Sequence, residues 1–272
     1  MRDIILCADD YALNAAVDSG IVQLVQMGRL SAVGCMTESP RWPTANNALP
    51  ALRDRIDIGL HFNLTQVFPG ADRGLPKQPL PVVLRSALLR SLSPHAIADS
   101  LHAQLDRFES VMGDAPDFVD GHQHVQIFPH IRGVLLQTLA KRYRLRRPWL
   151  RQVNPVLSPG ADWNKRALLG LLNTRFASAA ERQGFACNRG FAGIYSLQPQ
   201  ADFAQLMQMW LQHARSGDLL MCHPGAEPGP DEIRTDEIAP TRPRELAWLA
   251  SDACARVLDE QQIRLVRFRE FA

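Results

Sequence analysis

Short apolar runs alternate with longer amphipathic segments along most of the chain. The runs show no polar alternation, which is typical of strands that are buried on both faces of a sheet. The first run is unusual because it leads directly into two adjacent carboxylates, Asp9 and Asp10. The predicted strands are residues 4–10, 30–36, 56–62, 118–119, 149–153, 193–197, 218–222 and 264–268.

Helical spacing of apolar residues, together with capping residues, predicts helices between these runs. Val17, Ile21 and Leu24 share one face of the first helix, and Gly28 is placed to end it. Ser93 is a suitable N-cap for a later helix. The predicted helices are residues 15–27, 93–112, 129–142, 165–182, 203–215 and 244–260, with a short one ending near residue 53.

The alternation of strands and helices predicts an α/β fold with a parallel sheet, either closed as a barrel or open and doubly wound. A chain of 272 residues suits a single domain, so we expect residues 1–272 to form one. Two stretches rich in Pro and Gly, residues 63–81 and 224–243, are predicted to be long irregular loops. Loops of this length are usually functional or mobile.

Composition and charge argue against several classes of function. The net charge is +2 and the arginines form no stripe with aromatic residues, so we expect no nucleic-acid partner. Asp9 interrupts the first apolar run, which does not fit a signal peptide, and no apolar run approaches the roughly 20 residues of a membrane span. The 5 cysteines form no Cys-x-x-Cys pair, which predicts reduced thiols and a cytoplasmic protein.

Polar residues with metal-binding side chains gather at the predicted strand ends. They are Asp9, Asp10, His61, Asp120, His122, His124 and His223. In a parallel sheet these strand ends lie on one face, so the residues are expected to converge. Taken singly, each histidine is more often structural, and the aspartates also suit a solvated turn. Their joint placement favours a site for a divalent ion, and an Asp/His/His set would leave positions open for water and substrate.

Several short motifs in this chain are similar to those of the YdjC-like carbohydrate deacetylases. They are Ala8-Asp9-Asp10-Tyr11, Gly59-Leu60-His61-Phe62-Asn63-Leu64-Thr65, Asp120-Gly121-His122-Gln123-His124-Val125, Phe128-Pro129 and Cys222-His223-Pro224-Gly225. The motifs run from the first predicted strand to the seventh, so the resemblance covers essentially the whole chain. Ala12 and Asn14 depart from the Gly and Ser that the family often has after the aromatic residue.

The resemblance implies an irregular TIM-like (β/α) barrel with long loops on its active face. It also implies that the protein removes acetyl groups from N-acetylated sugars with one divalent metal ion, Mg or Zn. Carried over to this chain, the metal ligands are Asp10, His61 and His122. Asp9 is then the general base and His223 the general acid.

Three further residues are expected beside these groups or at the substrate. Asp120 is expected to orient His122 or His223, and a helix or turn cap is the alternative. His124 is expected to lie behind the ligands. Arg151 is expected to contact a polar group of the substrate, and a surface position is the alternative. The expected partner is a small N-acetylated sugar, and a homodimer is expected from base rates alone.

Two other functions fit the same pattern. A different metal-dependent barrel enzyme, such as a sugar isomerase or an amidohydrolase-type hydrolase, needs further carboxylate ligands or a carboxylated lysine at a strand end. Lys77, Lys141 and Lys165 do not follow a predicted strand, which weakens this alternative. A non-catalytic sugar- or metal-binding protein would lack a base or an acid, whereas Asp9 and His223 are both present.

Overall fold

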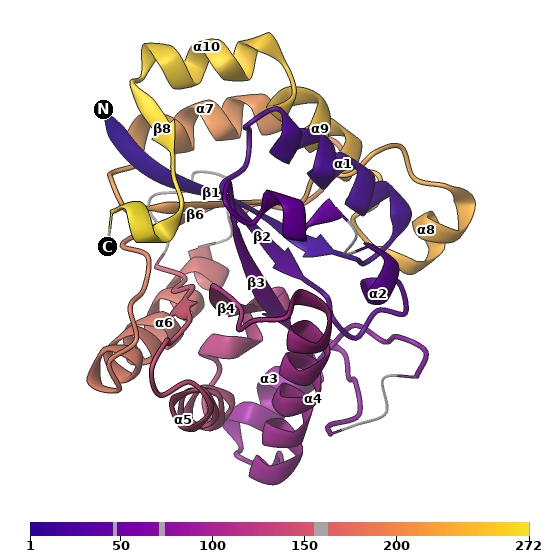
Figure 1. Ribbon diagram of the computed structural model, residues 1–272, viewed down its shortest axis with the longest axis vertical. Helices are drawn as coiled ribbons and strands as arrows, with labels where there is room; N and C mark the ends of the chain where they lie inside the picture. The colour runs from indigo at the N-terminus through magenta and orange to yellow at the C-terminus, as the bar shows by residue number, and fades with distance from the viewer. Residues whose placement is uncertain (46–47, 71–73, 155–162, 272) are drawn as a thin grey trace.

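A computed structural model of the protein describes residues 1–45, 48–70, 74–154 and 163–271. Its centre is an 8-stranded parallel sheet, and helices surround the strands (Figure 1). The strands are β1 (Arg2–Tyr11), β2 (Ala32–Cys35), β3 (Asp57–Phe62), β4 (Phe118–Gly121), β5 (Trp149–Leu150), β6 (Phe191–Ala192), β7 (Leu219–Cys222) and β8 (Ile263–Leu265). Their order in the sheet is β5-β4-β3-β2-β1-β7-β6, and β8 pairs with β1. The predicted α/β class with a parallel sheet is confirmed.

The helices connect successive strands, as crossovers in a parallel sheet must. They are α1 (Ala15–Gln26), α2 (Trp42–Ala45), α3 (Leu80–Leu88), α4 (Pro94–Met112), α5 (Ile131–Arg142), α6 (Trp163–Arg182), α7 (Phe203–His213), α8 (Pro230–Thr235), α9 (Arg242–Leu249) and α10 (Asp252–Glu260), with 3₁₀ turns at Pro50–Leu52, His122–Ile127 and Phe268–Glu270. Ser93 caps α4, as predicted, by accepting a hydrogen bond from the Ala96 N–H. Among the described residues, no helix has both the length and the apolar character that crossing a bilayer requires.

β1 is the central strand and has three neighbours. Its residues Arg2–Ile4 pair with β8, Ile5–Ala8 pair with β7, and Cys7–Tyr11 pair with β2. The side chains from Ile4 to Ala8 are at most 1% exposed. The unbroken apolar run at the start of the chain therefore reflects a strand that is covered on both faces.

The sheet is curled but open. Within the described part of the chain, the path of paired strands ends at β5 and β6, which do not pair with each other. An isolated parallel bridge between Leu150 and Cys187 spans part of the gap. β5 and β6 are 2 residues long each and offer few ladder hydrogen bonds for closure. The architecture is thus a parallel half-barrel, and not a closed barrel.

Several predicted elements have wrong boundaries. The strand predicted at 149–153 ends at Leu150, and the one predicted at 264–268 is β8, which ends at Leu265 before a 3₁₀ turn. Two elements differ more clearly. The segment predicted as one helix over 244–260 is divided into α9 and α10, because the Ser251 side chain accepts a hydrogen bond from the Cys254 N–H and caps a new helix. The strand predicted at 193–197 lies earlier, at β6. Gly193 has a φ of +115°, a left-handed conformation that turns the chain out of the strand.

The two predicted loops contain more helix than expected. The stretch 224–243 includes α8 and the first residues of α9, and α3 begins at Leu80, inside the stretch 63–81. Pro is among the first residues of all three helices, where its missing N–H costs nothing. The same prolines that favour a loop in the sequence therefore mark helix starts in the structure.

Residues 267 and 268 cover the end of the sheet that lies opposite the predicted site. The buried Asp57 carboxylate accepts hydrogen bonds from Arg267 Nε at 2.9 Å and from the Phe268 N–H at 2.8 Å. The rings of Phe118, Trp149 and Phe268 stack in sequence, with centroid distances of 4.5 and 4.9 Å. This end therefore serves stability, and the polar strand ends lie at the other end.

Candidate metal centre and active site

The carboxyl end of β1 brings both aspartates to one site. Neighbouring residues of a regular strand point to opposite faces, but β1 is irregular between Ala8 and Tyr11, and Asp10 has a φ of +69°. As a result, Asp9 Oδ2 and Asp10 Oδ1 lie 3.9 and 3.5 Å from the same atom, Nε2 of His61. Backbone strain of this kind is common at functional sites.

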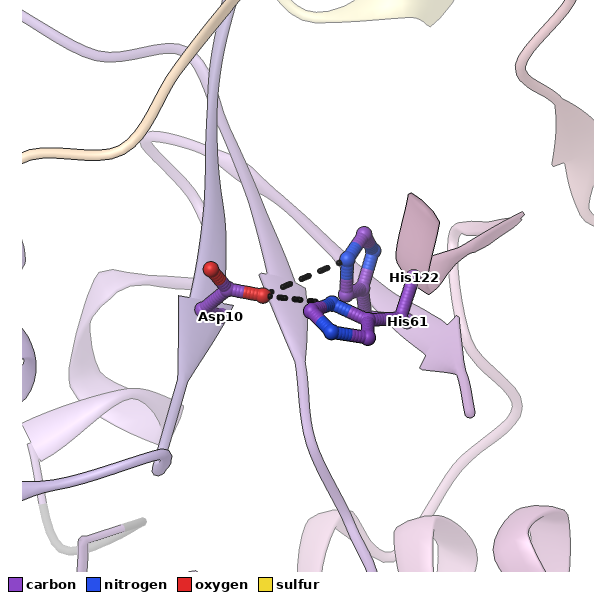
Figure 2. A group of neighbouring side chains, drawn as sticks. All are labelled: Asp10, His61 and His122. Atoms are coloured by element: carbon purple, nitrogen blue, oxygen red, sulfur yellow. Dashed lines mark hydrogen bonds and ion pairs between the residues drawn. The ribbon is translucent and has the colours of Figure 1, made fainter. Parts of the chain in front are cut away.

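Asp10, His61 and His122 form a group that can hold a metal ion (Figure 2). Each offers one ligand atom, and these atoms all lie within 4.8 Å of one another. His122 Nδ1 is 3.0 Å from Asp10 Oδ1, and the two imidazole rings meet edge to face. The group joins the ends of β1, β3 and β4, so the predicted convergence of strand ends is confirmed for these three residues.

Asp120 orients His61, and not the histidines for which it was predicted. Its Oδ1 lies 2.6 Å from His61 Nδ1, so the Nδ1 hydrogen is directed at Asp120 and Nε2 faces Asp10. The two residues lie side by side in the register of β3 and β4. The sequence could not distinguish among the histidines, because all of them follow strands on the same face.

Arg151 is completely buried, so a surface position is wrong. Its Nη1 donates to Asp9 Oδ2 at 2.7 Å and its Nη2 to Asp9 Oδ1 at 2.5 Å. Nη2 also lies 2.7 Å from Asp120 Oδ2 and 2.9 Å from Cys7 Sγ. Cys7, Asp9 and Asp120 could by themselves hold a metal, but the guanidinium supplies the positive charge there.

The two neighbouring aspartates are both held in the charged form. Burial works to raise the pKa of Asp9, but Arg151, His61 and His223 outweigh it and lower that pKa to about 2. Burial also acts on Asp10, whose pKa lies well below its ordinary value because of Arg242 and His122. A buried pair of charged carboxylates requires nearby positive charge, which suits a cation site.

The pKa of His61 reflects the same demand for positive charge. Burial lowers this pKa, but Asp120, Asp9 and Asp10 outweigh it and raise the pKa to about 9. This environment favours a second proton on the imidazole when no metal ion is bound. A divalent ion would replace that proton as the partner of the carboxylates.

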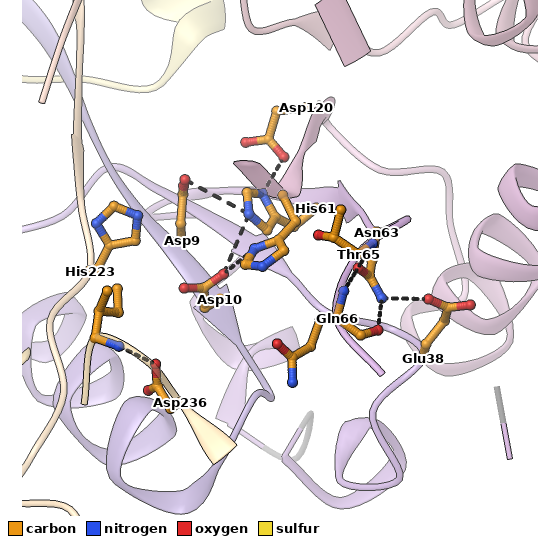
Figure 3. Close-up of polar contacts among 12 residues, drawn as sticks. Asp9, Asp10, Glu38, His61, Asn63, Thr65, Gln66, Asp120, His223 and Asp236 are labelled. Atoms are coloured by element: carbon orange, nitrogen blue, oxygen red, sulfur yellow. Dashed lines mark hydrogen bonds and ion pairs between the residues drawn. The ribbon is translucent and has the colours of Figure 1, made fainter. Parts of the chain in front are cut away.

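His223 follows β7 and lies on the opposite side of Asp9 and Asp10 from His61 (Figure 3). Its backbone N–H donates to Glu245 Oε2 at 2.5 Å. The segment after it packs tightly, because a Cβ on Gly225 would lie 3.1 Å from Arg242 Cβ. The glycine of the Cys-His-Pro-Gly motif thus allows α9 to approach the site.

Arg242, Asp236 and Glu245 are charged residues at the site that were not predicted. Arg242 Nη2 donates to Asp10 Oδ2 at 2.8 Å, so the oxygen of Asp10 that does not face the histidines is already engaged. Arg242 Nε donates to Asp236 Oδ2 at 2.6 Å, which holds the guanidinium in place. Arg242 and Asp236 lie within the stretch 224–243, and their place in a predicted active-face loop was the signal that the sequence offered.

The start of the loop after β3 is fixed beside the ligands (Figure 3). The Asn63 side chain accepts hydrogen bonds from the Thr65 and Gln66 N–H groups and donates to Glu38 Oε2 at 2.8 Å. Lys77 Nζ pairs with Glu38 Oε1, also at 2.8 Å, and ties the far part of this loop to the same carboxylate. Asn63 and Lys77, from two described parts of this loop, are therefore both held by Glu38.

His124 follows His122 by two residues and is not part of the group formed by Asp10, His61 and His122. Its ring meets the ring of Phe191 edge to face, with 5.5 Å between the centroids. Its φ of +61° and that of Gln123, +54°, show that the chain turns sharply after His122. The role of His124 stays a prediction.

Comparison with known proteins identifies the family. The model of the YdjC-like protein family matches residues 3–260. The chain belongs to this family. It is 28% identical over 275 residues to a carbohydrate deacetylase of Geobacillus stearothermophilus, covering 99% of this chain and 98% of the relative. It is also 29% identical over 154 residues to a chitooligosaccharide deacetylase of Salmonella typhimurium, covering 52% of this chain and 57% of that protein.

A solved structure shares the fold of this YdjC-like protein. It comes from Enterococcus faecalis V583 and is described as a candidate cellobiose-phosphate cleavage protein. The TM-score is 0.75 at 18% sequence identity, and the match covers 100% of this chain and 99% of that one. At this identity the likeness shows a common fold.

Proposed function

We propose that this YdjC-like protein is a metal-dependent carbohydrate deacetylase, which hydrolyses the N-acetyl amide of a small acetylated amino sugar to acetate and a free amine. One observation carries the proposal: Asp10, His61 and His122 form a group that could hold a metal ion. The carboxylate of Asp9 and the imidazole of His223 lie beside this group. The names of the relatives, carbohydrate deacetylase and chitooligosaccharide deacetylase, support the substrate class.

The donor set fits a divalent ion. Asp10 Oδ1, His61 and His122 provide one carboxylate and two imidazoles, and Asp120 fixes the His61 ring from behind. Arg242 occupies the second oxygen of Asp10, which favours a single bond from this carboxylate to the ion. Two imidazoles favour Zn²⁺ over Mg²⁺, which prefers oxygen ligands. A bound ion would supply a Lewis acid that acidifies water and polarises the acetyl carbonyl.

Asp9 is suited to hold the attacking water and to take its proton. It is charged and adjacent to the ligand group, with Oδ2 3.9 Å from His61 Nε2. Arg151 contacts both of its oxygens and fixes the plane of the carboxylate. In this role Asp9 is the general base, and Arg151 positions it.

His223 is suited to protonate the departing amine. It lies across the two aspartates from His61 (Figure 3). We infer that the leaving nitrogen of the substrate faces it when the acetyl carbonyl faces the ligand group. Histidine is the side chain that most often acts as a general acid in enzymes. Amine release needs this proton, because an amide anion is a very poor leaving group.

The proposal also covers the domain organisation, localisation and partners of the protein. In this proposal residues 1–272 make up one catalytic domain, built on an open TIM-like half-barrel whose active-face loops line a sugar-binding cleft. We propose a cytoplasmic enzyme that works without nucleic acid and forms a homodimer. A sugar isomerase on the same scaffold is disfavoured, because Lys77 is paired with Glu38 away from the described ligand group.

The proposal is tested by acetate release from a panel of N-acetylated amino sugars and chito-oligosaccharides, with added divalent metals and with chelator. Metal-dependent release that falls at least about 100-fold in Asp9→Asn is the expected result, because Asp9 acts as the base. Full activity in that variant would remove Asp9 from this role. Absence of acetate release from every sugar, with metal bound, would contradict the proposed function.

A further inference from the structure

Glu245 is a completely buried carboxylate on α9, one turn after Arg242. Burial raises its pKa, whereas His223, Tyr195 and Arg242 favour its charged form. Burying a carboxylate is costly unless it is well paired. A charge in this position, close to the proposed acid, therefore requires an explanation beyond packing.

Glu245 binds the backbone of His223 and faces one edge of its ring. Oε2 accepts the backbone N–H of His223 at 2.5 Å, and Oε1 lies 4.0 Å from His223 Nδ1. Oε1 also accepts the hydroxyl of Tyr195. His223 Nδ1 is buried and has no hydrogen-bond partner within the described residues. Because the other ring nitrogen, Nε2, lies on the opposite edge of the imidazole, it is directed away from Glu245.

We propose that Glu245 is the positioning residue of the proton donor: it holds His223 with Nδ1 toward its own carboxylate and Nε2 toward the amine that leaves. This inference rests on the proposed deacetylase function. As the C–N bond breaks, Nε2 gives its proton to the amine nitrogen, and the ring becomes neutral. Nδ1 keeps its hydrogen facing Glu245, which stays charged throughout and stabilises the protonated ring before transfer.

Tyr195 and Arg242 have different parts in this arrangement. Tyr195 donates to Glu245, and this hydrogen bond favours the charged form of the carboxylate against the effect of burial and fixes its position. Arg242 donates a hydrogen bond to Asp10, and its Nη1 lies 3.5 Å from the carbonyl oxygen of His223. On the other side, the charge that faces His223 is that of Asp9. Asp120 and Glu245 thus orient one histidine each, His61 and His223.

The variant Glu245→Gln tests the proposal. Glutamine has the same shape, can accept the His223 N–H and can donate to the Tyr195 oxygen, so the fold is preserved while the charge is removed. The expected result is a fall in kcat of about 10- to 100-fold on an N-acetyl sugar, with unchanged KM and unchanged bound metal. Hydrolysis of p-nitrophenyl acetate falls at least about tenfold less, because a nitrophenolate leaves without being protonated.

Asp57→Asn is the matched control, since it removes a buried carboxylate at the other end of the sheet. It is expected to lower stability and to leave the ratio of amide to ester activity unchanged. An unaltered kcat on the sugar in Glu245→Gln, or an equal fall on sugar and ester, would overturn the role of Glu245. An inactive wild type on all N-acetyl sugars would instead contradict the proposed function, so the two failures can be told apart.

Discussion

Replacing Arg151 by Met should destabilise the metal-free protein strongly. The guanidinium is 0% exposed and lies within 2.7 Å of oxygens on both Asp9 and Asp120. Removing one partner of a buried ion pair costs about 3–5 kcal/mol, because the remaining charges lose their compensation. Methionine is long and apolar, so it fills most of the space and little of the loss comes from a cavity.

Urea unfolding at pH 7 with chelator measures this effect. The matched control is Arg146→Met, which removes pairs with Asp114 and Asp117 from an arginine whose side chain is 62% exposed. Such a pair contributes less than about 1 kcal/mol. If Arg151→Met lowered the free energy of unfolding no more than Arg146→Met, the buried ion pairs of Arg151 would not stabilise the fold. That result would contradict the prediction.

The same variant should show a distinct pH dependence. The pKa of Asp9 is about 2 in the folded protein and 3.8 ordinarily, so its ionisation stabilises the fold above about pH 4, by about 2 kcal/mol. This contribution disappears as the pH falls toward 2, because both states then bind the proton. Arg151→Met lacks the contribution, so its deficit relative to wild type should shrink from pH 7 to pH 3. A constant deficit would contradict the assigned pKa.

Two further predictions concern the ligands and the strained turn. Asp120→Asn should weaken metal affinity about 10- to 100-fold, because His61 loses its orienting partner; competition with a chromophoric chelator measures this, and unchanged affinity would exclude the role. Ala12 has a φ of +73°, which costs a residue with a Cβ about 1–2 kcal/mol. Ala12→Gly should therefore be at least about 1 kcal/mol more stable than the control Ala8→Gly, an equally buried position on β1, as judged by urea unfolding. Equal stability of the two variants would show that the turn is unstrained.

The sequence was sufficient to predict the α/β class and the convergence of the ligand group. Asp10, His61 and His122 each follow an apolar run, and parallel strands place such residues on one face whatever the connections between them. The turn at Ala12, where the family often has Gly, also left a trace in the sequence. Only the positive φ of Ala12 in the structure shows that this position favours glycine.

The partners of these residues could not be predicted. Arg151 was expected at the substrate or on the surface, because no local pattern shows that a guanidinium is buried against carboxylates of other strands. Glu245 and Arg242 come from the first turn of a helix, and helical spacing only shows that they share a face. Which histidine Asp120 contacts depends on the register of β3 and β4, which is a tertiary property.

A metal titration of the stripped enzyme shows whether one divalent ion per chain is required for acetate release. We predict that acetate release from an N-acetyl sugar rises with added Zn²⁺ and saturates at one bound ion per chain, since Asp10, His61 and His122 form one ligand group. His61→Ala should bind less metal and lose activity in proportion. Full acetate release in the stripped enzyme, or unchanged metal binding in His61→Ala, would contradict the account.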